Sequence, residues 1–222
     1  MENPIDQPHR EIDYRDNSIR ASRIILIFRI TLFFYILIIA ANYYLRHVAK
    51  TDYSILYTDK NLVLIQSLIF FINYPLIILM IIFFLQWFHR SYYNLQQIPE
   101  VKTLFKPNWA AICWFIPIFN LIVPYLIMRE VVLKNIAVRE DELNPGRYNF
   151  KIATWWILYI FGTYFSTSMG IWYVIYPNEN SPLVILKWNM IFLSALIISL
   201  FVVISLIRKI NEWETDLRES QT

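Results

Sequence analysis

The stretch Pro107-Asn108-Trp109-Ala110-Ala111-Ile112-Cys113-Trp114-Phe115-Ile116-Pro117-Ile118-Phe119-Asn120-Leu121-Ile122-Val123-Pro124-Tyr125 decides how this chain is expected to fold. It is apolar enough to enter a bilayer, but Pro117 and Pro124 each remove a backbone donor and obstruct a regular helix. Between them, Asn120 is a side chain that hydrocarbon does not tolerate without a partner. Non-helical backbone survives at membrane depth only when it is buried in protein or lines a water-filled cavity. We therefore expect the function to depend on this stretch.

Composition places the rest of the chain in a membrane. Of the 222 residues, 57% are hydrophobic, and the mean hydropathy is +0.42, whereas a soluble domain is usually about 45–50% apolar. The single cysteine, Cys113, excludes an internal disulfide and a multi-cysteine metal site. The net charge of +3, without a dense basic cluster, argues against a nucleic-acid partner. The chain is expected to be a polytopic membrane protein, with the lipid bilayer as its first partner.

Four apolar runs are long enough to cross a bilayer, which needs about 20 residues. The predicted spans are residues 24–43, 61–88, 150–176 and 183–207. They form a membrane domain, 24–207, between polar tails at residues 1–23 and 208–222. Arg29 in the first span is either a snorkelling side chain or a buried counter-charge.

The distribution of basic residues predicts the path of the broken segment, residues 108–128. If this segment crosses the membrane, the loops carry eight Lys and Arg on one side and eleven on the other. If it doubles back, the cytoplasmic side carries fifteen and the opposite side four. Basic residues favour the cytoplasmic side of short loops, so we predict a re-entrant or interfacial hairpin that turns near Asn120, with both termini cytoplasmic. A proline-kinked crossing that violates the charge rule is the alternative.

Two further patterns complete the predicted all-α fold. Apolar residues recur at helical spacing from Leu126 to Asp141, which predicts an amphipathic helix on the cytoplasmic surface. Gly162, Ser166 and Gly170 form a ridge of small residues that lets another backbone approach closely. The partner at this ridge is either a helix of this chain, a second copy in a homo-oligomer, or another membrane protein.

Several short patterns resemble a known bacterial family. They are Arg90-x-x-x-Asn94-Leu95, Pro107-x-Trp109-Ala110, Trp114-Phe115-x-Pro117-Ile118-x-Asn120-Leu121-x-x-Pro124-Tyr125, Arg129-Glu130 and Trp155-Trp156. Over roughly residues 60–210 the chain is similar to the family called domain of unknown function 4328. The resemblance implies a multi-pass protein of the bacterial cytoplasmic (inner) membrane. It implies no chemistry, because the family has no assigned activity.

No pattern in the sequence indicates catalysis. The predicted spans contain neither Asp nor Glu, which argues against a proton relay and against an intramembrane aspartyl protease. The three histidines, His9, His47 and His89, lie in different segments, and no zinc-protease, phosphate-loop or nucleophile-elbow motif is present. We therefore expect a protein that is not an enzyme and that has no catalytic residue, metal site or cofactor.

The candidate functional residues surround the broken segment. They are Trp109, Trp114, Pro117, Asn120, Pro124 and Tyr125, together with Arg90, Asn94 and Glu130 beside it. Arg90 follows the second span and Glu130 follows the hairpin at the same interface. We predict that Glu130 pairs with Arg90 and fixes the exit of the hairpin to the second helix. An ordinary solvated ion pair, worth less than about 1 kcal/mol, is the competing interpretation.

Two functions are compatible with these features. The first is a non-enzymatic membrane component that binds a protein or lipid partner through the small-residue ridge and the amphipathic helix. The alternative is a channel or facilitator for an ion or small solute, lined by the hairpin around Asn120. The scarcity of polar residues inside the spans favours the first.

Overall fold

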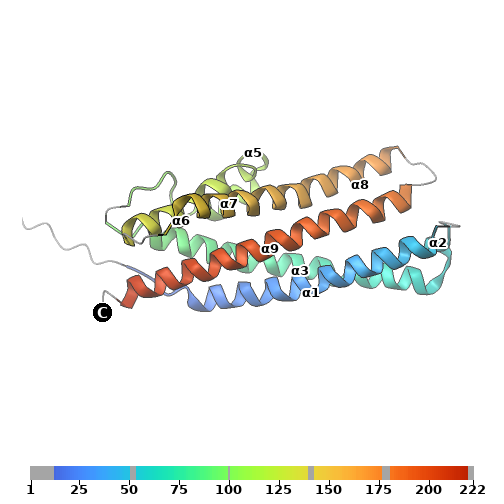
Figure 1. The fold of residues 1–222 in the computed structure, drawn as a ribbon, viewed down its shortest axis with the longest axis horizontal. Coiled ribbons are helices and arrows are strands. Elements are labelled where there is room, and N and C mark those ends of the chain that lie inside the picture. Colours follow the sequence, from blue (N-terminus) through green and yellow to red (C-terminus); the bar gives the residue numbers. More distant parts are fainter. Residues whose placement is uncertain (1–12, 51–53, 100, 140–142, 177–180, 220–222) are drawn as a thin grey trace, which may run out of the picture.

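The computed structural model describes residues 13–50, 54–99, 101–139, 143–176 and 181–219, and in these ranges all regular secondary structure is helical. Long helices lie side by side in an elongated bundle (Figure 1). The elements are α1 (Ser18–Val48), α2 (Ile55–Thr58), α3 (Lys60–Leu95), α4 (Trp109–Ile112), the 3-10 turn η1 (Cys113–Phe115), α5 (Pro117–Asn120), α6 (Val123–Arg139), α7 (Pro145–Ile160), the π-helical turn η2 (Phe161–Phe165), α8 (Ser166–Ile175) and α9 (Ser181–Glu219). The predicted all-α class is confirmed.

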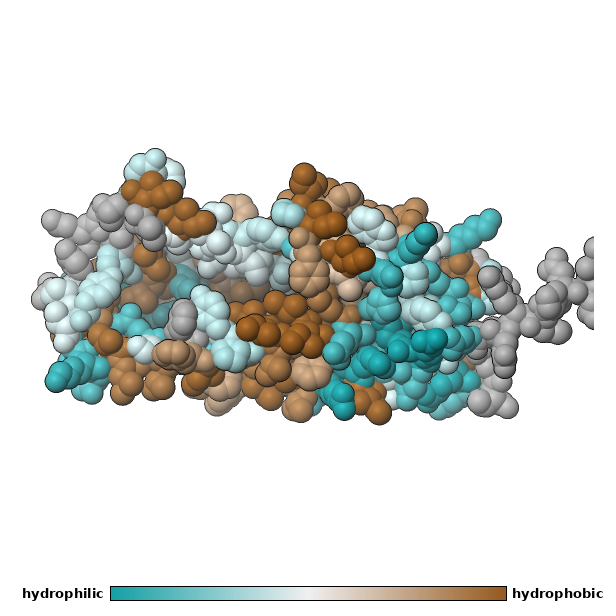
Figure 2. All heavy atoms as spheres, turned by 180° about the vertical axis from the view of Figure 1, so that it is seen from behind, coloured by the Kyte–Doolittle hydropathy of each residue, from teal (hydrophilic) through white to brown (hydrophobic). Residues whose placement is uncertain are grey.

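Three helices, α1, α3 and α9 from Pro182 onward, are long and apolar enough to cross a membrane. They have 31, 36 and 39 residues, which at about 1.5 Å per residue gives roughly 46–58 Å against about 30 Å of hydrocarbon. The helices therefore extend beyond the predicted spans. Hydrophilic side chains gather at one end of the molecule, and hydrophobic ones cover much of the rest (Figure 2). We call this end, which carries the start of α1 and the close of α9, the polar end.

The fourth apolar run is one continuous helical stretch from Pro145 to Ile175, formed by α7, η2 and α8. Its π-helical turn contains Gly162, where an added Cβ would lie 2.5 Å from the Cγ atom of Leu196 on α9. An added Cβ at Gly170 would meet no atom within 4 Å. The predicted ridge of small residues therefore contacts a helix of this chain at Gly162, and its far end, at Gly170, is open.

The helix predicted from Leu126 to Asp141 runs from Val123 to Arg139 in the described residues, and its environment differs from the prediction. Its side chains Ile127, Met128, Val131 and Val132 are fully buried. The helix packs its apolar face against α3, α7 and α9 of the same chain. The reason is that α3 and α9 continue past the predicted ends of their spans and offer a protein surface on which α6 buries its apolar face.

The polar tail predicted at residues 208–222 is helical as far as Glu219, because α9 continues through it. Within it Trp213 and Glu214 are buried. Trp213 packs against Tyr148 of α7, with ring centroids 5.6 Å apart. The main hydrophobic core therefore continues into the polar end.

Candidate functional site

The broken segment leaves the polar end and returns to it. Lys134 Nζ, on α6, donates a hydrogen bond to the backbone carbonyl of Lys102, so the two ends of the segment meet. α5 lies beside α7, and α6 runs from there back toward the polar end (Figure 1). Pro117 is the first residue of α5 and Pro124 lies in the first turn of α6, positions where a helix needs no donor from proline. The two prolines divide the apolar run into short helices, as their positions predict.

Aromatic side chains hold the inner face of the segment. The Trp114 ring lies 5.4 Å from Phe84 of α3 and 5.9 Å from Trp156 of α7, centroid to centroid. The indole Nε1 of Trp156 donates to the Leu121 carbonyl at 3.0 Å, which satisfies a backbone group near the turn. Trp109 lies 5.3 Å from Phe119 and ties the two arms together. The segment is thus fixed to α3 and α7.

Its outer face is apolar and uncovered. Phe115 is 73% exposed and Ile118 is 76% exposed. Ile112, Leu121 and Ile122 are exposed beside them. A contiguous exposed apolar surface of this kind indicates a membrane or protein contact.

Asn120 lies at the turn, and its Oδ1 atom is buried without a hydrogen-bond partner among the described residues. Leaving a buried acceptor unsatisfied costs about 1–3 kcal/mol. Tyr125, the last residue of the motif, is half-buried and packs against the main core. The turn therefore carries one polar group that the described chain does not satisfy.

Glu130 anchors the segment, but not through Arg90. Tyr92 Oη donates to Glu130 Oε2 at 2.6 Å, and Lys134 Nζ forms an ion pair with Oε1. The Leu104 amide donates to the same carboxylate at 3.2 Å. Burial and the bond to Glu130 raise the pKa of the Tyr92 hydroxyl. The predicted Arg90–Glu130 pair is wrong because residues two apart on a helix point to nearly opposite sides, and α6 packs on the side that carries Tyr92.

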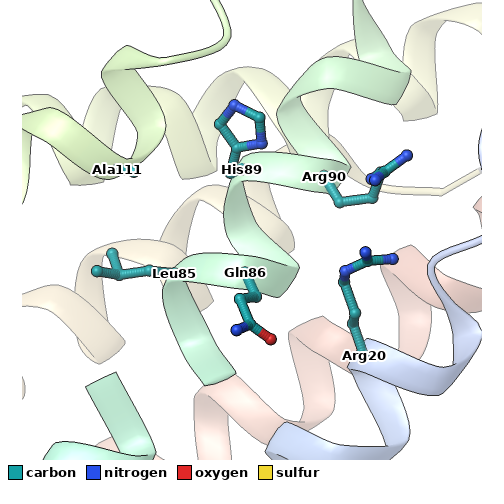
Figure 3. Close-up of a pocket in the computed structure, with 6 residues that line it drawn as sticks. All are labelled: Arg20, Leu85, Gln86, His89, Arg90 and Ala111. Carbon is teal, nitrogen blue, oxygen red and sulfur yellow. The ribbon is translucent and has the colours of Figure 1, made fainter. Parts of the chain in front are cut away.

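Arg90 instead faces α1. With Arg20 of α1, Gln86 and His89 of α3 and Ala111 of α4, it lines a cavity of about 480 Å³ that Leu85 also borders. The Arg20 side chain extends toward Arg90, and the two guanidinium groups lie on the same side of the pocket (Figure 3). Burial, followed by the charges of Arg20 and Arg15, lowers the pKa of Arg90. We call this cavity the basic pocket.

Asn94 fixes the residues that precede α1. Its Oδ1 accepts from the Arg15 amide at 3.2 Å, and its Nδ2 donates to the Arg15 carbonyl at 2.8 Å. Asn17 Nδ2 donates to Ser91 Oγ at 2.9 Å one turn away. These bonds attach the start of α1 to α3 and leave the Oδ1 atom of Asn17 without a partner among the described residues. Asn94 thus binds the residues before α1 and Arg90 lies beside Arg20 of α1, whereas Glu130 binds the chain that leads into the broken segment.

Sequence reasoning missed Glu214. Its side chain is only 5% exposed, and neither carboxyl oxygen accepts a well-formed hydrogen bond from the described residues. Burial raises the pKa of Glu214 to about 7, and the polar groups of Ser91, Asn17 and Asn94 beside it oppose the shift only in part. The signal was its position, because Glu214 continues the helical face of Val203, Ile207 and Ile210 on α9.

Comparison with known proteins identifies a family and no activity. The family described as Domain of unknown function (DUF4328) matches residues 48–215. This range contains the hairpin, Glu130 and Arg90, and it leaves Arg20 outside. A search of curated proteins and a search of solved structures each gave no match. The resemblance seen in the sequence motifs is confirmed.

Proposed function

We propose that this chain, which belongs to the DUF4328 family, is a non-enzymatic membrane component that binds a lipid or protein partner at its polar end. It spans the bacterial inner membrane four times, through α1, α3, the α7–α8 run and α9, and it places both termini in the cytoplasm. The unbroken helical stretch from Pro145 to Ile175 supports the fourth span. The excess of Lys and Arg in the loops of the polar end supports the orientation.

The observation that carries the proposal is the difference between the two faces of the hairpin, one packed on protein and the other apolar and exposed. Trp114 and Trp156 fix one side to protein, whereas Phe115 and Ile118 on the other side are exposed. Exposing each of these two side chains to water costs about 1.5–3 kcal/mol of free energy relative to an apolar environment. In the cytoplasmic leaflet they lose this cost, and the hairpin becomes a contact surface at the depth where headgroups meet acyl chains.

The polar side chains within the predicted spans favour a packed interior without a water-filled path over a channel. The Nδ2 atom of Asn42 on α1 donates a hydrogen bond to the Oδ1 atom of Asn189 on α9 at 2.8 Å, so these two amides bind each other. Asn73 borders a cavity of about 200 Å³ whose other lining residues, from α1 and α3, are apolar. Asn120 lines neither this cavity nor the basic pocket. A conduction pathway needs polar groups in sequence along it.

Lipid-depth quenching separates the two functions. Cys113→Ala removes the single cysteine, and Ile118→Cys then carries a bimane label in proteoliposomes. We expect quenching by lipids with a spin label on the acyl chain and protection from aqueous iodide. Arg208→Cys, an exposed position at the close of the last predicted span, is the aqueous control. Iodide quenching at position 118 without lipid quenching would support the channel and contradict the proposal.

A further inference from the structure

We propose that the basic pocket binds the phosphate group of an anionic phospholipid. This inference rests on the proposed function and names the ligand class at its polar end. The observations that carry it are two neighbouring arginines and an apolar wall, at a place next to the ends of two predicted spans.

The positive charge of the pocket is not balanced by the described residues. No ion pair forms with Arg20 or Arg90 there. The described acids nearby form their ion pairs elsewhere, since Asp13 pairs with Arg15, and Asp16 pairs with Arg218 at 3.0 Å. The charge of Asp13 opposes the lowering of the pKa of Arg90 only in part. Two like charges held together in a partly buried site repel each other, and an anion between them relieves that repulsion.

The donors suit a phosphate group. Arginine presents a planar fork that binds phosphate oxygens in a bidentate manner, and Arg20 and Arg90 approach from two different helices (Figure 3). Gln86 and His89 add polar side chains to the lining. The Nε2 atom of His89 lies 3.2 Å from Asn108 Oδ1, which holds the ring beside the start of the hairpin.

The walls and the depth of the pocket point to a lipid. Leu85 and Ala111 supply apolar surface within it. Ile82, one turn before Gln86 on α3, is 45% exposed and offers an acyl chain a path into the bilayer. Arg20 precedes the first predicted span by four residues and Arg90 follows the second by two, so both lie where headgroups lie. The shared chemistry is a phosphate anion, which a free phosphate in the cytoplasm also supplies.

Native mass spectrometry of the full chain in detergent tests the assignment. Wild type, the Arg20→Gln/Arg90→Gln double variant and Arg208→Gln are incubated with equal amounts of phosphatidylglycerol and phosphatidylcholine. Arg208 matches each member of the pair in charge and in its place at the end of a span, but it is exposed and outside the pocket. Wild type and Arg208→Gln should retain phosphatidylglycerol on the order of tenfold better than phosphatidylcholine. The double variant should lose this preference.

A second variant keeps both charges. Ala111→Leu fills the pocket, so it should lower retention of phosphatidylglycerol while leaving the net charge unchanged. This variant still tests the pocket if the double variant does not fold. In a separate arm, inorganic phosphate at millimolar concentration competes with the lipid. Unchanged lipid retention supports the lipid as the source, and full displacement would overturn it in favour of a soluble phosphate.

Equal retention by wild type, the double variant and Ala111→Leu would overturn the pocket as the site. That result is separable from failure of the proposed function, because the quenching of a label at position 118 does not depend on Arg20 or Arg90. If the label at position 118 is quenched by lipid but phosphatidylglycerol is not retained selectively, only the assignment of the pocket is overturned. If the label at position 118 is quenched by iodide instead, the proposed function is overturned even if the arginines bind phosphate.

Discussion

The polar end of the bundle and its apolar middle differ in how much of each helix is buried within the protein. At the polar end, Trp87 and Trp213 are at most 1% exposed, and α6 packs on three other helices. Farther along the bundle, only 12% of the most apolar stretch of α3 is buried within the protein, against 50% for α9. A helix such as α3 therefore ends in a protein core but presents an apolar surface along its middle. The difference shows that the polar end is stabilised by packing, whereas the rest is suited to lipid.

The largest expected effect is a difference in stability between two variants that each lose a tryptophan, one in the polar end and one on the apolar surface. Trp213→Ala empties a site in the core of the polar end and should destabilise the protein by about 3–5 kcal/mol. Trp172→Ala, on the α8 surface where the side chain is 59% exposed, should cost less than about 0.5 kcal/mol. Thermal unfolding in one detergent measures both. Equal losses would show that the two regions do not differ in packing.

The buried carboxyl of Glu214 should give the polar end a pH dependence. Its pKa is raised from 4.5 to about 7, so between these values the folded chain holds a proton that the unfolded chain releases. This contribution to stability is complete below pH 4.5 and decreases as the pH rises through 7, by roughly 3 kcal/mol in total. The pKa of Asp13, lowered to about 2, leaves that group charged in both states over this range.

The matched variants for this prediction lie two residues apart on α9. Glu214→Gln should remove the loss of stability between pH 5 and 8, as followed by thermal unfolding. Glu212→Gln replaces a carboxylate that is 60% exposed and paired with Lys209, and it should keep the wild-type slope. A wild-type curve that is flat, or that rises with pH, would contradict the assignment.

A somewhat smaller effect is expected where the polar end holds the hairpin. Glu130→Ala leaves the Tyr92 hydroxyl and the Leu104 amide without their acceptor, which should cost about 2–3 kcal/mol. Glu130→Gln keeps an acceptor oxygen and should lose less. Chemical unfolding in mild detergent compares the three proteins. A stability of Glu130→Ala equal to that of wild type would mean that the hairpin is held by its aromatic contacts alone.

The smallest effect tests a close contact between η2 and α9 outside the polar end. Gly162→Ala places a methyl group against Leu196 of α9, and we expect a loss of about 1–2 kcal/mol. Gly170→Ala meets open space and should be neutral or slightly stabilising, because alanine favours helix. Thermal unfolding of the two variants gives the difference. Equal behaviour would argue against tight packing at η2.

Hydropathy and prolines predicted much of the fold, and they did so through local physics. Long apolar runs predicted α1, α3 and α9, and Pro117 and Pro124 predicted a break where α5 and α6 begin. The sequence did not reveal that the helices, and the core between them, continue past the predicted spans, because that depends on which faces meet. For the same reason Glu130 binds Tyr92 rather than Arg90, and Glu214 stood out only after α9 was seen to continue past Ile207. Side-chain partners between helices require the packing itself.

The central claim is that the broken segment leaves the polar end and returns to it without crossing the membrane. In a Cys113→Ala background, single cysteines at Lys102 and Ala137 flank the segment, and Lys60→Cys marks the opposite end of α3. All three positions are exposed. A membrane-impermeant maleimide applied to sealed right-side-out vesicles should label position 60 alone, and inverted vesicles should label 102 and 137 together. Labelling of 102 and 137 from opposite sides would contradict the account.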